Sequence, residues 1–545
     1  MKKFIIPVVF FWAALFSCAQ KEKADLLVYH ATIYTVDSSF STAEAMAIKD
    51  GKVLATGTRD SLEKIYSAKE SWDAGGKFIF PGFIDAHAHF AGYALGLAKA
   101  NLTGTGSWHE VLEILKTYAK ENPEGWLIGR GWDQNDWDIK SFPVNDSLNV
   151  LFPDRPVLLT RIDGHAAVAN QKALELAGVS PEQLVKGGVI ESRNGHMTGV
   201  LVDNAVDLVT AKIPPVTGDQ LKKALKTAEQ NCLAVGLTTI DDCGLPYNTI
   251  EQIRRFQDSG DLKMRLYIML SDEAANFAWA EKNGMIKTDR LNVRSFKVYG
   301  DGALGSRGAC LLQPYHDDPK NYGFLLSSAA HFDSVAAWLY KKGWQMCTHA
   351  IGDSGNRVIL DIYTKYLAHQ NDLRWRIEHA QVINKDDMHK FLACSIIPSV
   401  QPTHATSDMY WAADRLGAER MYGAYAYGSL LQMNGWIPLG TDFPVEDISP
   451  FKTFYAAYVR KDAKGWPPAG FQTDNGLTRE QTIRGMTIWA AKANFEEKEK
   501  GSLEKGKWAD FVVLDGDLMK EDPSKLLSVQ VLRTYIAGEK LFSRN

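Results

Sequence analysis

Short apolar segments recur along the middle of this 545-residue chain, and each is followed by a longer stretch of helical character. The segments are residues 78–90, 236–244, 263–270, 295–302, 344–353, 374–381, 395–402 and 436–444. Alternating strands and helices are typical of parallel sheets, and eight such units favour a closed barrel. We therefore predict an α/β fold built on a (β/α)8 TIM-type barrel over residues 79–494.

The two ends of the chain have a different pattern. Residues 24–78 alternate apolar and polar side chains around a turn signal at Asp50-Gly51. Residues 495–545 show the same alternation. A period of two is typical of half-buried β-strands. We expect the two ends to form one small β-sandwich beside the barrel.

The interval between the first two predicted strands exceeds a hundred residues, whereas a crossover needs only about a dozen. Residues 101–215 are therefore interpreted as an insertion, which would stand as a cap over the catalytic face of the barrel. Its Trp126, Trp132 and Trp137 lie among acidic residues, a composition that suits a small-molecule pocket. Packing of the insertion explains the same tryptophans equally well.

The N-terminal segment is typical of a secretory signal over residues 1–18. Lys2 and Lys3 precede an apolar run that ends near Phe16, and this run is too short to span a bilayer. The letters LFSC, which end at Cys18, resemble a bacterial lipobox. We expect a lipoprotein of the cell envelope that faces the periplasm and touches the membrane only through Cys18. Ordinary signal cleavage is the alternative.

Charge and cysteine content exclude several classes of protein. A net charge of −4 gives no general attraction to nucleic acid. The six cysteines are scattered without the CxxC spacing of structural zinc sites. The sequence does not decide whether any two of them pair in a disulfide. We expect a small-molecule partner and leave the oligomeric state open.

Histidines and acids fall at the ends of the predicted strands. Asp85, His87 and His89 alternate along the first strand, so both imidazoles face one side. An HxH pair alone is weak evidence, although neutral imidazoles are the ligands that Zn2+ prefers. His349, His379 and Asp442 end three later strands, where barrel enzymes place catalytic groups. Together these residues predict a metal site.

Lys297 lies in the middle of a predicted strand, with Asp301 four residues later. A lone ammonium facing the barrel interior is costly, and a cation is the wrong charge beside metal ions. Either Lys297 pairs with Asp301 or extends its ammonium outward, or CO2 carboxylates it to an anionic carbamate. We favour the carbamate, because its long stem suits a deep strand position.

The motifs PGFIDAHAHF, GTDFP and GSLEKGKWADFVVLD, with Lys297, His349 and His379, resemble the amidohydrolase superfamily. The motifs GRGWDQNDWD, DGHAAVAN, FKVYGDGALGSRGA, HAIGD and RIEHAQ narrow this to a branch that includes N-substituted formamide deformylase. The resemblance covers nearly everything after the signal segment. It implies a metal-dependent barrel with a split β-sandwich and a cap, which hydrolyses a non-peptide carbon–nitrogen bond in a small amide or formamide.

The resemblance also implies roles for the site residues. His87, His89 and Asp442 would hold one metal, and His349 and His379 the other, with carboxylated Lys297 as the bridge between two Zn2+ ions. Metal-activated hydroxide would attack the substrate, and Asp442 would move the proton. Apart from the resemblance, Trp132, His165, Asp301 and Arg307 are the predicted substrate contacts, because they lie in the insertion or at a strand end. For His165, a role in loop structure is an equal alternative.

Two rival functions stay open. A one-metal deaminase needs the same histidines and Asp442 but has no use for Lys297. A non-catalytic, lipid-anchored binding protein would be expected to have lost a ligand, and the sequence retains all of them.

Overall fold

The computed structural model describes residues 21–367 and 371–544. At its centre is a ring of parallel strands, which confirms the predicted barrel class. The strand order around the ring is β6(Phe83–Ala88), β13(Leu237–Leu245), β14(Arg265–Ser271), β16(Leu291–Tyr299), β17(Gln345–Ala350), β18(Arg376–His379) and β19(Ile397–Ser399). Each strand runs parallel to its neighbour, and nearly all of their residues are buried. These seven strands form a nearly closed barrel.

The eighth predicted strand bridges the remaining gap without forming a regular strand. The backbone N–H of Gly440 donates to the carbonyl of Val400 at 3.0 Å, and that of Ala86 donates to Leu439 at 3.2 Å. A Cβ at Gly440 would lie 2.6 Å from the backbone nitrogen of His87. Glycine is therefore required where this segment passes the first strand.

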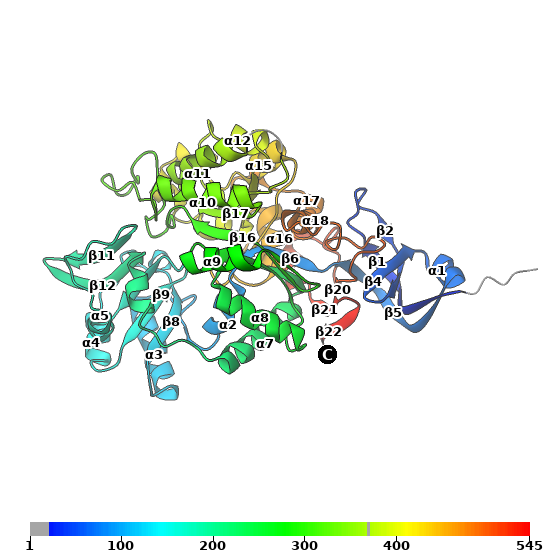
Figure 1. Ribbon diagram of the computed structural model, residues 1–545, viewed down its shortest axis with the longest axis horizontal. Coiled ribbons are helices and arrows are strands. Elements are labelled where there is room, and N and C mark those ends of the chain that lie inside the picture. Colours follow the sequence, from blue (N-terminus) through cyan, green and yellow to red (C-terminus); the bar gives the residue numbers. More distant parts are fainter. Residues whose placement is uncertain (1–20, 368–370, 545) are drawn as a thin grey trace, which may run out of the picture.

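Helices cover the outside of the barrel, with α10 and α11 on one side and α7 and α8 on the other (Figure 1). They are α7(Gly218–Ala234), α8(Tyr247–Asp258), α9(Ala274–Asn283), α10(Ala329–Lys342), α11(Asp353–Tyr366), α12(His389–Ala393), α15(Tyr427–Asn434), α16(Pro450–Val459), α17(Arg479–Gly485) and α18(Ile488–Ala493). In α7, a capping box between Thr217 and Gln220 fixes the start, and Leu221, Leu225 and Cys232 lie on its buried face. An apolar stripe of this period packs the helix against the strands.

Both chain ends join in one mixed sheet at the far side of the barrel (Figure 1, blue and red). Its strand order is β22(Glu539–Ser543), β21(Val531–Ile536), β20(Phe511–Leu514), β5(Tyr66–Pro81), β1(Glu22–Tyr34), β3(Ala45–Lys49) and β4(Lys52–Gly57), with β2(Thr42–Ala43) paired to β1. The β5–β20 pairing links the two ends of the chain. The strands form one continuous hydrogen-bonded sheet rather than two separate ones.

The insertion forms a second sheet on the opposite side of the barrel (Figure 1, cyan). It follows β6 and α2(Phe90–Gly96), and its order is β11(Gly188–Arg193), β12(His196–Asp203), β10(Ala166–Ala169), β9(Val157–Arg161), β8(Leu127–Trp132) and β7(Ala100–Asn101). The helices α3(Trp108–Glu121), α4(Asp146–Leu151), α5(Gln171–Ala177) and α6(Val206–Thr210) belong to the same unit. Asn204 ties it to the barrel by donating to the carbonyl of Leu326 at 3.1 Å.

The predicted signal segment and Cys18 lie outside the described residues. Within the described ranges, none of the helices combines the length and apolar character needed to cross a membrane. The five cysteines described there are free, so no disulfide forms among them.

Candidate metal centre

Asp442 is the residue on which the site converges. Its Oδ1 lies 3.2 Å from His89 Nε2 and 3.6 Å from His87 Nε2. The two histidines come from the carboxyl end of β6, and Asp442 follows the segment that closes the barrel. The two imidazoles offer one nitrogen each and Asp442 offers one oxygen, and these three atoms lie close enough to share a metal ion.

A second group of possible ligands shares Asp442. His379 ends β18, and His404 lies in α13(Pro402–Asp408), which begins just after β19. His404 Nε2 is 3.3 Å from Asp442 Oδ2, and its Nδ1 is 3.2 Å from Glu446 Oε1. His404 is absent from the predicted set. Its position after the seventh strand is the signal that could have revealed it.

Lys297 and His349 line the same space. Lys297 is fully buried in β16, and its Nζ lies 3.1 Å from His87 Nε2. The ring of His349, near the end of β17, is 4.6 Å from the ring of His379. His349 Nε2 lies 3.8 Å from a carboxylate oxygen of Asp301. Among the described residues, no ion pair joins Lys297 to Asp301, so the alternative in which these two residues pair is not formed.

The donor atoms at this centre fit a divalent cation. Asp442 Oδ1, His349 Nε2 and His379 Nδ1 are buried and have no hydrogen-bond partner among the described residues. Buried polar atoms normally have one, so a ligand is the physical explanation for several orphans in one place. Burial lowers the pKa of His349 and of His379 well below the usual range, which keeps both imidazoles neutral. Neutral imidazole with carboxylate is a donor set that suits Zn2+.

A surrounding set of hydrogen bonds orients the ligands. His87 Nδ1 donates to Glu378 Oε2 at 2.6 Å, and His89 Nδ1 donates to the carbonyl of Cys243 at 3.0 Å. Both bonds fix the imidazoles with Nε2 toward Asp442. Asp85 accepts from the backbone and hydroxyl of Thr441, which holds the segment next to Asp442. Partners of this kind are the usual support of metal ligands.

The backbone at two of the ligands is strained. His379 has φ of 73° and Asp442 has φ of 64°, in the left-handed region that non-glycine residues rarely adopt. Such strain costs about 1–3 kcal/mol at each residue and persists where function requires it. Here it turns both side chains toward the common centre.

The insertion contributes His165 to the site. Its ring lies 5.1 Å from the ring of His349, and its Nδ1 donates to Asp203 Oδ1 at 2.6 Å. The side chain keeps 15% of its surface exposed. His165 is therefore placed to meet a molecule bound beside the metal ligands.

Two other predicted substrate contacts need correction. Trp132 is fully buried in the core of the insertion, where its indole N–H donates to the carbonyl of Leu159 at 2.8 Å. Asp301 is also fully buried, and its oxygens accept backbone N–H groups from Cys310, Ile351 and Gly352. Neither side chain has exposed surface, and the polar atoms of both are already paired within the protein, so neither is placed to contact a substrate.

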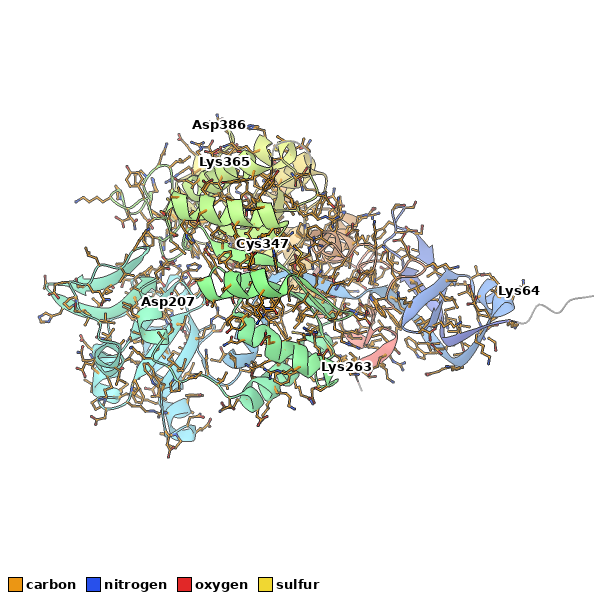
Figure 2. All side chains as sticks on the ribbon, viewed as in Figure 1. Lys64, Asp207, Lys263, Cys347, Lys365 and Asp386 are labelled. Carbon is orange, nitrogen blue, oxygen red and sulfur yellow. The ribbon has the colours of Figure 1, made fainter. Side chains whose placement is uncertain are left out.

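Arg307 and Cys347 are engaged by other groups of the protein. The guanidinium of Arg307 is paired with Asp317 at 2.8 Å. Cys347, labelled on the central strands in Figure 2, is a buried thiol 3.3 Å from Gln345 Oε1. The burial of this thiol raises its pKa well above the usual range, so it is a poor metal ligand.

A nearly closed parallel barrel with these donors at the carboxyl ends of its strands defines a metal-dependent hydrolase of the amidohydrolase type. The amidohydrolase family pattern matches residues 70–542, so the chain belongs to that family. It is accordingly a hydrolase that acts on carbon–nitrogen bonds.

Curated relatives match almost the whole chain. The chain is 33% identical to the protein LONG AFTER FAR-RED 3 of Arabidopsis thaliana, over 95% of this chain and 92% of the relative. It is 30% identical to the YtcJ amidohydrolase of Bacillus subtilis, over 94% and 98%. Identity to the N-substituted formamide deformylase of Arthrobacter pascens is 26%, over 95% and 98%.

Solved structures show the same architecture. An uncharacterized metal-dependent hydrolase from Pyrococcus horikoshii superposes with a TM-score of 0.75 at 25% identity, over 91% of this chain and 99% of that one. A second, from Pyrococcus furiosus, gives 0.72 at 26% identity, over 91% and 100%.

Proposed function

We propose that this protein hydrolyses a non-peptide carbon–nitrogen bond in a small amide or formamide. The observation that carries the proposal is a pair of ligand groups that share Asp442, with Lys297 and His349 beside them and orphaned donor atoms among them. The two groups are His87–His89–Asp442 and His379–His404–Asp442. The deformylase relative, whose name specifies N-substituted formamides, supports this substrate class.

The proposed cofactor is a pair of Zn2+ ions. His87, His89 and Asp442 would hold one ion, and His349 and His379 the other, with Lys297 carboxylated as the bridge. His404 joins the candidates for the second position because it groups with His379 and Asp442. When bound, divalent ions supply Lewis acidity, which lowers the pKa of water and polarises a carbonyl.

The side chains account for proton transfer and orientation. Asp442 accepts the proton of the attacking water and delivers it to the leaving nitrogen. The water oxygen bonds to the carbonyl carbon, the carbon–nitrogen bond breaks, and a carboxylic acid and an amine leave. His165, held by Asp203, contacts the substrate from the insertion.

The test is an assay of the purified protein on N-substituted formamides and acetamides, with an aminopurine as the deaminase probe and metal content measured in parallel. We expect formation of amine from the amides in proportion to bound metal. Ammonia release from the aminopurine alone would favour the one-metal deaminase. Turnover of neither class by metal-loaded protein would favour the binding protein.

The proposed location is the cell envelope, with a lipid anchor at Cys18. This rests on residues 1–18, which lie outside the described part of the chain. A Cys18→Ser variant should leave the membrane fraction. A wild-type chain already soluble after export would contradict the anchor.

A further inference from the structure

Two cations at the start of the insertion, Lys99 and Arg130, form no ion pair among the described residues. Lys99 and Arg130 are partly buried, and neither has a carboxylate within ion-pair distance anywhere in residues 21–367 and 371–544. The one hydrogen bond of the Arg130 guanidinium in that range goes to the carbonyl of Ile162 at 2.7 Å. Their charge is left for something else to balance.

The other arginines of the insertion are satisfied. Arg161 is clamped between the carboxylates of Asp133 and Asp163. Arg193 pairs with Glu191 at 2.9 Å, and Arg155 donates to three backbone carbonyls. Arg130 is therefore an exception within its own sheet. It is also more enclosed than the exposed lysines that need no partner.

The sheet register places the two cations together. β7 and β8 are parallel, with Asn101 opposite Arg130, and Lys99 lies two residues before Asn101. Lys99 lies in the bend that leads directly into β7, so the chain places it next to the strand that carries Arg130. Burial lowers the pKa of Lys99, and the positive charge of Arg130 lowers it further.

The contacts of Arg130 lead to the catalytic space, and Lys99 lies beside Arg130. Ile162, which accepts from Arg130, lies three residues before His165, the insertion residue that faces His349. Burial lowers the pKa of Arg130, and the negative charges of Asp442 and Asp163 oppose that shift. Arg130 thus lies within the electrostatic reach of the acid at the metal centre.

Desolvating a cation without a partner costs free energy, and an incoming anion recovers it. A guanidinium presents a planar fork of donors that matches a carboxylate, and a nearby ammonium adds a point charge. We propose that Lys99 and Arg130 bind a carboxylate on the substrate, so the amide cleaved here is anionic, as in an N-acyl amino acid. This inference rests on the proposed function and specifies its substrate class.

The experiment uses pairs of compounds that differ only in a carboxylate. N-formyl derivatives of alanine, leucine and phenylalanine are compared with those of ethylamine, 3-methylbutylamine and phenethylamine, on metal-loaded wild type. We test Arg130→Gln, Lys99→Gln and the charge-preserving Arg130→Lys. Arg193→Gln is the matched control, with the same charge change on the same sheet but away from the site.

Wild type should prefer the carboxylated member of at least one pair by about tenfold or more in kcat/KM, which corresponds to about 1.4 kcal/mol. Arg130→Gln and Lys99→Gln should each remove most of that preference and leave the neutral member within about twofold. Arg130→Lys should retain part of it, and Arg193→Gln all of it. Metal content and Tm should match wild type, and Lys99→Gln decides the question if Arg130→Gln fails to fold.

The carboxylate site would be overturned if the Arg130→Gln and Lys99→Gln variants lost kcat/KM equally on the carboxylated and the neutral compound of each pair. It would also be overturned if wild type showed no preference between them. If no compound is hydrolysed, calorimetry on the same proteins separates the two proposals. Binding of the carboxylated compounds that weakens in Arg130→Gln would support the anion site while the hydrolytic function fails. Absence of such binding would overturn the site as well.

Discussion

The carboxylate of Glu378 lies 2.6 Å from Nδ1 of His87, and both side chains are fully buried. Arg376 Nη1 lies 3.9 Å from the other oxygen of this carboxylate. Burial raises the pKa of Glu378, but the hydrogen bond from His87 and the charge of Arg376 outweigh it, so the pKa is lowered. Glu378 therefore accepts a hydrogen bond as an anion and fixes the tautomer that leaves His87 Nε2 free for metal.

Replacing Glu378 with glutamine should weaken metal binding by roughly 10- to 100-fold, because the amide is a poorer acceptor for the imidazole N–H. The measurement is a competition titration with a chelator whose affinity is known. Glu480→Gln on the surface of α17 is the control. Unchanged metal affinity in Glu378→Gln would mean that this contact has no part in the metal site.

His404 should affect turnover more than substrate binding. It contacts Oδ2 of Asp442 while His89 contacts Oδ1, so it holds the carboxylate from the other side. We expect His404→Asn to lower kcat by about 100-fold or more, with little change in KM, because proton transfer by Asp442 depends on its orientation. The exposed His109→Asn is the control. A change confined to KM would instead make His404 a substrate contact.

Lys297→Ala should lose metal and activity together, because the bridge between the ligand groups would be missing. Short carboxylic acids or bicarbonate should restore part of both by filling the vacated space. Native mass spectrometry of the wild-type protein at alkaline pH should show the added mass of one CO2. An unmodified Lys297 amine in active, metal-loaded protein would refute the carbamate.

The cap residues should separate into a structural and a functional class. Trp132→Ala should lower the free energy of unfolding by about 3–5 kcal/mol, because it empties the core of the insertion. His165→Asn should leave Tm near that of wild type and change kcat/KM by different factors for different amides. A uniform loss in His165→Asn with lowered Tm would assign it to structure.

The strand pattern was sufficient to predict the barrel and to place the candidate ligands His87, His379 and Asp442 at strand ends, because apolar strands that end in polar residues are recognisable along the chain. His404 was missed because it lies within a short helix a few residues beyond β19, whereas the predicted histidines lie at or next to strand ends. Trp132 was misjudged because composition alone does not distinguish a pocket wall from a packed core. The unpaired state of Arg130 depends on which carboxylates lie near it in space, which spacing along the chain does not reveal.

The central claim is that the convergent histidines, Lys297 and Asp442 form a catalytic metal centre. The most direct test removes the metal with a chelator, measures residual metal and turnover of an amide in the same sample, and then restores Zn2+ stepwise. Turnover should disappear with the metal and return in proportion to the zinc bound, up to two ions per chain. Full turnover by protein shown to be metal-free would contradict it.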